Sequence, residues 1–256
     1  MDDLDLLIDL HLRNDRQGPG SDADTIRALE LARIDPDTPL RVADFGCGCG
    51  AASLCLAREL GDSLAAPITA IDMLPAFVER LRERAADAGL ADRIDAHTGN
   101  MGAPPLEANT LDLLWSEAAI YNIGFAEGVR AWKPLLRPGG TLVVSELSWT
   151  TASRPEEIEA HWTTEYPGIT TVSANMRTLE DAGYAPIGFF FIPGSSWLAN
   201  YYEPLGAGHD AFLERHDHSD AARAIVENDR AEADLYRAHA QWFGYAFYIA
   251  RTPAVA

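Results

Sequence analysis

Three glycines alternate with two cysteines in one short turn, Gly46-Cys47-Gly48-Cys49-Gly50, and this turn constrains the fold most strongly. The apolar run 40–45 before it predicts a buried strand, and residues 51–60 after it predict a helix that Gly61 ends. Because glycine has no side chain, the backbone here can approach a ligand closely and adopt conformations barred to other residues. A doubly wound α/β sheet places its ligand-binding turn at this point. The turn therefore predicts such a sheet with a ligand beside its first strand.

The rest of the chain repeats the alternation of strand and helix. Apolar runs predict seven strands, at 40–45, 68–71, 94–98, 111–115, 141–147, 187–192 and 242–250, and helical patterns fall at 51–60, 74–88, 120–136 and 174–182. Strands that alternate with helices form a mainly parallel sheet covered on both faces. We therefore expect a Rossmann-like, doubly wound, mainly parallel seven-stranded α/β sheet.

Two segments lie outside this alternation. Residues 1–36 carry helical patterns at 3–13 and 26–34, the second preceded by Ser21 and Asp24 at capping-box spacing, and we expect them to form an N-terminal helical cap that acts as a lid. The main domain is then 37–256. It includes 193–240, an aromatic and helical insertion between the last two strands that we expect over the edge of the sheet.

The composition of the chain limits the classes of partner that it could bind. The chain of 256 residues suits one α/β domain, as a monomer or homodimer, and its formal net charge of −19 repels phosphate backbones and anionic lipids. We therefore expect no nucleic-acid partner and no membrane. The acidic N-terminus and the lack of a long apolar stretch predict a cytoplasmic protein. The cysteine spacing does not suit a zinc site, so we expect no metal.

Two carboxylates flank the glycine turn. Asp44 precedes the first glycine, and Asp72 ends the second strand, where a carboxylate can accept hydrogen bonds from both hydroxyls of an adenosine ribose. Gly46, Gly48 and Ala51 would also satisfy a dinucleotide fingerprint. Asp44 suits a cationic ligand better than a pyrophosphate, and the chain leaves no room for the substrate domain that a dehydrogenase normally adds.

Residues 42–50 and 135–142 resemble the first and last signature motifs of class I S-adenosylmethionine-dependent methyltransferases. The resemblance implies S-adenosyl-L-methionine as cofactor and S-adenosyl-L-homocysteine as product. It also implies that Gly46, Gly48 and Gly50 line the methionine part, that Asp72 holds the ribose and that Met73 contacts adenine.

Further cofactor contacts follow from the same resemblance. Where the family often has Asp-Met or Asp-Ala after the third strand, this chain has Asn100-Met101, and Asn100 can accept the hydrogen bond of the adenine amino group. The stretch Ser116–Gly124 is similar to one in an uncharacterised, small-molecule-type subgroup of the family, which adds Ser116 to the cofactor candidates.

Four residues are candidates for catalysis. Methyl transfer is a direct displacement that needs alignment in a dry pocket and no covalent nucleophile, so only a base or positioning groups are expected. Glu117 and Tyr121 follow the fourth strand, and Tyr201 and Tyr202 belong to the aromatic insertion. Each residue could instead have a structural role: Glu117 could stabilise a helix N-terminus, and the tyrosine rings could pack within their own segments. His11 and His161 are further candidate bases.

The sequence thus predicts an S-adenosylmethionine-dependent methyltransferase with a small-molecule acceptor. Three alternatives stay open: a methyltransferase of protein or RNA, a nucleotide-sensing or NAD-binding protein without methyl transfer, and an enzyme of the same fold that uses another group of the cofactor.

Overall fold

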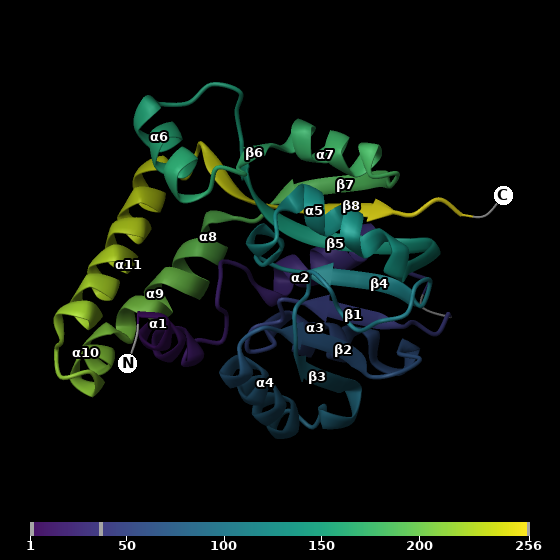
Figure 1. Ribbon diagram of the computed structural model, residues 1–256, viewed down its shortest axis with the longest axis horizontal. Helices are drawn as coiled ribbons and strands as arrows, with labels where there is room; N and C mark the ends of the chain where they lie inside the picture. The colour runs from purple at the N-terminus through teal and green to yellow at the C-terminus, as the bar shows by residue number, and fades with distance from the viewer. Residues whose placement is uncertain (1–2, 36–37, 255–256) are drawn as a thin grey trace.

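The computed structural model describes residues 3–35 and 38–254 (Figure 1). Within them, seven strands follow the order β3-β2-β1-β4-β5-β8-β7 across one sheet. Their bounds are β1 Val42–Phe45, β2 Ile68–Asp72, β3 Ile94–Thr98, β4 Leu111–Ser116, β5 Leu136–Trp149, β7 Ala185–Phe191 and β8 Phe243–Arg251. The pairs from β3 to β5 are parallel, whereas β8 runs antiparallel to both β5 and β7. The predicted mainly parallel seven-stranded sheet is confirmed.

Helices cover both faces of the sheet. The helices α2 Asp22–Ala32, α3 Ala51–Leu60 and α4 Pro75–Asp87 bury their apolar side chains in one core cluster, and α5 Phe125–Trp132 and α7 Val172–Asp181 in the other. Every residue of β1 and β4 is buried, as strands covered on both faces should be. Two short 3-10 turns follow these helices: η1 Gly61–Ser63 lies between α3 and β2, and η2 Ala91–Arg93 lies between α4 and β3.

The predicted single helix over 120–136 is wrong. A 3-10 turn, η3 Ile120–Asn122, precedes α5, and a second one, η4 Lys133–Leu135, follows it. Gly124 has a φ of 81° just before α5, which breaks the helical path, and Pro134 cannot donate a backbone hydrogen bond. The break leaves η3 as a separate turn beyond the carboxyl end of β4.

Two elements were not expected from the sequence. Helix α6, Glu156–Glu165, follows β5, and the two-residue strand β6, Thr170–Thr171, pairs with the end of β5. A two-residue strand is too short to show a period, and α6 contributes only Ile158 to the buried core.

The segment between the last two strands is helical, as its pattern predicts. It contains α8 Gly194–Trp197, the π-helical turn η5 Leu198–Tyr202, α9 Glu203–Ala207, α10 His209–Arg215 and α11 Asp220–His239. Because β8 is antiparallel, it begins beside the carboxyl end of β5, and the helices lie beyond that end of the sheet, next to α1 Asp3–Leu12 (Figure 1).

The N-terminal segment packs against this insertion. Asp9 of α1 accepts hydrogen bonds from Arg215 and His216 at the end of α10, at 2.8 and 2.9 Å. The predicted cap of the second helix is confirmed, since Ser21 accepts a hydrogen bond from the backbone of Asp24. The proposed boundary between residues 36 and 37 lies outside the described residues. No helix in the described part of the chain is long and apolar enough to span a membrane.

Candidate functional site

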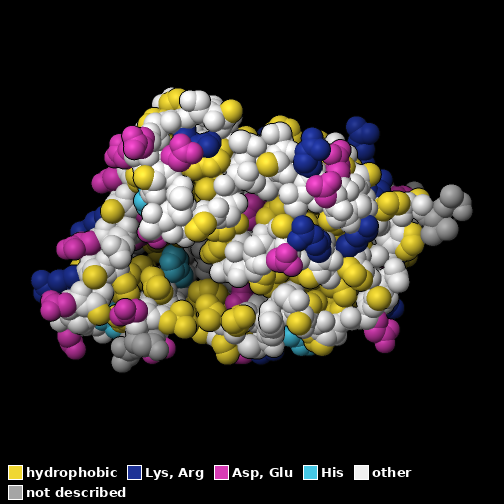
Figure 2. Space-filling model, turned by 45° about the horizontal axis from the view of Figure 1, so that its top comes forward, with side chains coloured by type: hydrophobic (Ala, Val, Ile, Leu, Met, Phe, Trp, Pro, Cys, Tyr) yellow, Lys and Arg dark blue, Asp and Glu magenta, His cyan; other side chains and the backbone are white. Residues whose placement is uncertain are grey.

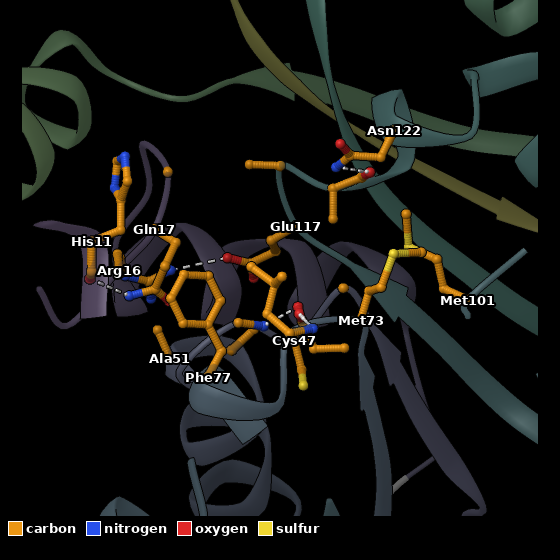
Figure 3. Close-up of a pocket in the computed structure, with 18 of the residues that line it drawn as sticks. His11, Arg16, Gln17, Cys47, Ala51, Met73, Phe77, Met101, Glu117 and Asn122 are labelled. Atoms are coloured by element: carbon orange, nitrogen blue, oxygen red, sulfur yellow. Dashed lines mark hydrogen bonds and ion pairs between the residues drawn. The ribbon is translucent and has the colours of Figure 1, made fainter. Parts of the chain in front are cut away.

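A cavity of about 610 Å³ lies beyond the carboxyl ends of β1, β2 and β4, where ligands bind in open α/β sheets. The glycine turn, the end of β2 and the loop after β4 form its walls, and the N-terminal segment lies across it (Figure 3). Figure 2 shows that the surface has a hollow bordered by hydrophobic side chains. The volume is in the range of pockets that bind cofactors and small substrates.

The glycine turn approaches its neighbours too closely for side chains. A Cβ at Gly46 would lie 2.3 Å from the Cβ of Ala119, and one at Gly48 would lie 2.6 Å from Oε1 of Gln17. Both glycines also have positive φ, at 68° and 53°, and both line the cavity. The turn therefore exposes backbone to the cavity at two points, as the sequence predicts.

Asp72 fixes this turn to the next strand. Its Oδ2 accepts a hydrogen bond from the backbone N–H of Gly48, and its Oδ1 accepts one from Leu74, both at 2.9 Å. Burial raises the pKa of Asp72, and these backbone donors oppose the rise. A carboxylate oxygen has more than one lone-pair site, so Asp72 keeps capacity for donors on the cavity side.

Asp44 is the most deeply buried ionisable group in the cavity wall. It is 1% exposed, and its Oδ2 accepts a hydrogen bond from Ser53 Oγ at 2.5 Å. Its Oδ1 is buried and has no partner. Burial raises the pKa of Asp44 to about 7. An unpartnered buried carboxylate oxygen is unfavourable, and a cationic donor in the cavity would relieve it.

Three further predicted contacts lie in the same wall. Met73 is 64% exposed and borders the cavity beside Asp72, and Asn100 and Met101 border it on the side of β3. Asn100 Oδ1 accepts a hydrogen bond from the backbone of Gly102, and the Met101 carbonyl accepts one from Trp132 Nε1. The loop after β3 is thus held by its own hydrogen bonds.

Three predicted residues do not line the cavity. Gly50 caps α3, and its missing Cβ would collide with Leu81 instead of meeting a ligand. Ser116 is fully buried at the end of β4. Tyr202 donates a hydrogen bond from its hydroxyl to Glu232 at 2.8 Å and packs inside the insertion. Sequence position placed them near the site, but Gly50 faces Leu81 and the side chains of Ser116 and Tyr202 are buried elsewhere.

Glu117 lines the cavity as predicted, yet its carboxylate already has three donors. Oε1 accepts hydrogen bonds from Trp115 Nε1 at 2.8 Å and Thr25 Oγ1 at 2.7 Å, and Oε2 pairs with Arg16 at 3.0 Å. A base must offer a free lone pair to the proton it removes. Glu117 therefore ties the N-terminal segment to β4, and this network was not visible in the sequence.

Gln17 is a residue that the sequence analysis missed. Its Oε1 accepts a hydrogen bond from the Cys49 backbone at 2.7 Å, and its Nε2 donates to the carbonyls of His11 and Asn14. Arg84 adds a second bridge, since it donates to the carbonyls of Asp15 and Cys49. The predicted helices at 3–13 and 26–34 leave this segment between them, but no periodicity reveals which polar side chain reaches across (Figure 3).

Comparison with known proteins agrees with the glycine turn and its carboxylates. A family model described as a methyltransferase domain matches residues 42–140. A dimethylglycine N-methyltransferase of Parasynechococcus marenigrum is 34% identical over 106 residues, which cover 41% of this chain and 36% of that protein. The matched part therefore spans about a third of the relative's length.

Solved structures extend the likeness in fold to almost the whole chain. An S-adenosylmethionine-dependent methyltransferase of Geobacter sulfurreducens, in complex with S-adenosyl-L-homocysteine, has a TM-score of 0.81 at 17% identity and covers 96% of this chain and 97% of that one. The chain therefore has the fold of S-adenosylmethionine-dependent methyltransferases, and its residues 42–140 match a methyltransferase domain. The structure of the [4+2]-cyclase SpnF has the same fold, with a TM-score of 0.74, 24% identity, and coverage of 91% and 82%. The fold alone therefore does not fix the reaction of this chain.

The cavity fits the cofactor of the methyltransferases to which this chain is similar. S-adenosylmethionine carries an ammonium group, a ribose with two hydroxyls and an adenine ring. The unpartnered Oδ1 of Asp44 suits the ammonium group, and Asp72, at the end of β2, has acceptor capacity for hydroxyls. Among residues 3–35 and 38–254, no group of three or more His, Cys, Asp or Glu side chains is arranged to hold a metal ion.

The far wall of the cavity is aromatic. Tyr121 and Tyr201 both border it, and the ring of His11 stacks on Tyr201 at a centroid distance of 6.2 Å. The His11 Nδ1 is buried without a partner, and burial lowers the pKa of His11. A lowered pKa favours neutral imidazole, which has one free lone pair. His11 thus has a free nitrogen beside one of the predicted catalytic residues, Tyr201.

Proposed function

We propose that this methyltransferase transfers the methyl group of S-adenosylmethionine to a small-molecule acceptor by direct displacement. The observation that carries the proposal is the unpartnered Asp44 carboxylate oxygen in a cavity whose other end is aromatic. One end suits the polar cofactor, and the other suits an acceptor that must meet it in a dry space.

The cofactor supplies an activated methyl group on a sulfonium sulfur. In the proposal, Asp44 holds the ammonium group of the methionine part, while Gly46 and Gly48 let backbone approach it. Asp72 accepts hydrogen bonds from the ribose hydroxyls. Met73, Asn100 and Met101 then border the adenine.

The N-terminal segment acts as a lid in this account. It crosses the cavity and is fastened by the Gln17 contact and by the Arg16–Glu117 ion pair, whose two side chains are almost buried. A closed lid excludes water and fixes the reacting atoms. We therefore assign residues 1–36 as a cap on a catalytic domain of residues 37–256.

Residues at the aromatic end of the cavity orient the acceptor and provide a base. Tyr121 and Tyr201 border the space in which the nucleophile would lie, and we assign them to orient it. His11 takes the proton of a protic nucleophile, because it is held neutral by burial and has a free nitrogen. This assignment replaces Glu117, whose carboxylate is held by the Arg16 ion pair and by two further donors.

A small acceptor is supported by three observations. The cavity has room for a cofactor and a modest partner, the formal net charge of −19 opposes binding to nucleic acid, and the matched relative is named for a small amino acid. A monomer or homodimer would suffice, since the described residues of one chain line the whole cavity.

The test is transfer of a labelled methyl group. The protein is incubated with methyl-labelled S-adenosylmethionine and a cell extract that has been divided by filtration into small molecules and macromolecules. We expect label in the small-molecule fraction and S-adenosyl-L-homocysteine as by-product. Label in protein or RNA would identify a macromolecular acceptor, and methylthioadenosine would indicate that another group of the cofactor is transferred. Either result contradicts the proposal.

A further inference from the structure

Helix α1 has two apolar faces, and only one of them packs into the core. Leu6 and Leu10 are buried, at 3% and 4% exposed, and they belong to the core cluster that includes side chains of the insertion. Three apolar side chains on another face of the helix line the cavity instead: Leu4, Leu7 and Ile8. Leu4 is 55% exposed and Leu7 is 40% exposed, so this second face borders open space in the cavity.

Phe77, in the first turn of α4, adds an aromatic ring to the same end of the cavity. Figure 3 shows His11 and Phe77 on one side of the pocket, and Met73 and Met101, the predicted adenine contacts, on the other side. Helix α1 also lies outside residues 42–140, the part of the chain that matches a methyltransferase domain. The apolar end of the cavity is therefore distinct from the predicted adenine site.

The charged side chains of the cavity wall are either paired with one another or lie at the glycine turn. Among the described residues that line the cavity, they are Arg16, Asp44, Asp72 and Glu117. Arg16 pairs with Glu117 at 3.0 Å and with Asp22 at 2.8 Å, so two carboxylates already balance its charge. Asp44 and Asp72 belong to the cofactor end in the proposed function. An anionic or cationic acceptor would thus find no free counter-charge beside α1.

This surface favours an acceptor without charge. The exposed surface of Leu4 and Leu7 is apolar, and a ligand that removed it from water would gain free energy in proportion to the area that it covers. A charged group in the same place would lose hydration without an ion-pair partner in return. A contiguous apolar surface at the mouth of a cavity is typical of a ligand-binding site.

We propose that the acceptor of this protein is a neutral molecule with an extended apolar group, which lies against Leu4, Leu7, Ile8 and Phe77. The proposal rests on the proposed function, and it deepens that function by naming the class of acceptor. The four apolar residues bind the acceptor and take no part in the transfer of the methyl group.

The first experiment compares chain length and charge in simple probes. The intact protein is saturated with S-adenosyl-L-homocysteine and titrated calorimetrically with 1-butanol, 1-hexanol and 1-octanol, and with octanoate and octylammonium. We expect the affinity of the alcohols to rise about three- to four-fold for each added methylene group. Octanoate and octylammonium should bind at least about ten-fold more weakly than 1-octanol. No binding of the alcohols, no rise with chain length, or a charged probe that binds as tightly as 1-octanol would overturn the proposal.

The second experiment makes the apolar face polar. The double variant Leu4→Gln, Leu7→Gln should weaken the binding of 1-octanol about ten-fold and that of 1-butanol less, while the affinity for S-adenosyl-L-homocysteine shows that the variant is folded. The matched control is Ile187→Gln, Phe189→Gln, since these side chains of β7 are 38% and 47% exposed and do not line the cavity.

The control should bind both alcohols as the wild-type protein does. If the double variant does not fold, Leu4→Gln alone tests the more exposed position, with an expected loss of about three-fold for 1-octanol. An unchanged affinity for 1-octanol in the site variants, or an equal loss in the control, would refute the apolar acceptor site.

The two levels of proposal fail separately. If S-adenosyl-L-homocysteine does not bind the wild-type protein, the proposed function is wrong. If it binds and the alcohols do not, the proposed function stands and only the neutral, apolar acceptor is wrong.

Discussion

The buried Asp44 and the part-buried Asp72 lie in one cavity wall, but their surroundings give them different roles. Asp72 is held by two backbone donors, whereas Asp44 has one hydroxyl donor and one unpartnered oxygen. A ligand ammonium group beside Asp44 would stabilise its ionised form and lower its pKa from about 7. Cofactor binding should therefore release a proton near neutral pH.

This gives a prediction for the pH dependence of binding. The affinity for S-adenosyl-L-homocysteine should fall about ten-fold between pH 8 and pH 6, because Asp44 must lose a proton that it holds below pH 7. Asp44→Asn should bind more weakly and lose this dependence. Calorimetry in buffers of different ionisation enthalpy measures the proton release. A wild-type affinity that does not vary with pH would show that Asp44 does not meet the ammonium group.

At the residue scale, the sequence predicted the positions of those residues whose role depends on where the backbone places them. Gly46, Gly48 and Asp72 follow strand ends, and the register of a parallel sheet brings strand ends together. It could not place Tyr202 or His11, because their role depends on side-chain direction within helices that only tertiary contacts orient. Both candidates were named, and the structure turns one away from the cavity and the other into its wall.

At the element scale, the Gln17 side chain joins the N-terminal segment directly to the glycine turn. Gln17→Ala removes the acceptor of the Cys49 N–H and both donors to the preceding loop. We expect S-adenosyl-L-homocysteine to dissociate about ten-fold faster and amide hydrogen exchange to increase in 10–20. Arg13→Ala, a change at an exposed side chain of the same segment, is the control. Equal dissociation rates of S-adenosyl-L-homocysteine from the two variants would contradict the role of this segment as a lid.

The elements themselves were predictable to different degrees. Strands buried on both faces show as apolar runs, so β1, β4 and β5 were readable. The helix over 120–136 was not, because the pattern remained helical through Gly124 while the backbone there turned away. The insertion was recognised as helical, but its position followed from the antiparallel direction of β8, which no local pattern encodes.

At the scale of the whole molecule, the buried carboxyl groups of Asp44 and Glu146 should influence the free energy of unfolding. Asp44 and Glu146 have pKa values raised to about 7 and about 8 from 3.8 and 4.5, so the folded chain binds more protons than the unfolded chain between these limits. Their stabilising contribution is complete below about pH 4 and is lost as pH rises through 7 and 8.

The ligand-free protein should consequently have a higher Tm at pH 6 than at pH 8, by several degrees for a free-energy difference of about 3 kcal/mol. Differential scanning calorimetry measures it at fixed ionic strength, since a net charge of −19 makes Tm sensitive to salt. The double variant Asp44→Asn, Glu146→Gln should show a flatter pH profile. A wild-type Tm that rises from pH 6 to pH 8 would contradict the assigned pKa directions.

Parallel calorimetric titrations with S-adenosyl-L-homocysteine and NAD test whether the cavity beside the glycine turn binds the adenosylmethionine cofactor. We expect one-to-one binding of S-adenosyl-L-homocysteine, no binding of NAD, and a ten- to hundred-fold loss of affinity in Asp72→Ala, about 1.5–3 kcal/mol. Tight binding of NAD with none of S-adenosyl-L-homocysteine, or an unchanged affinity in Asp72→Ala, would contradict it.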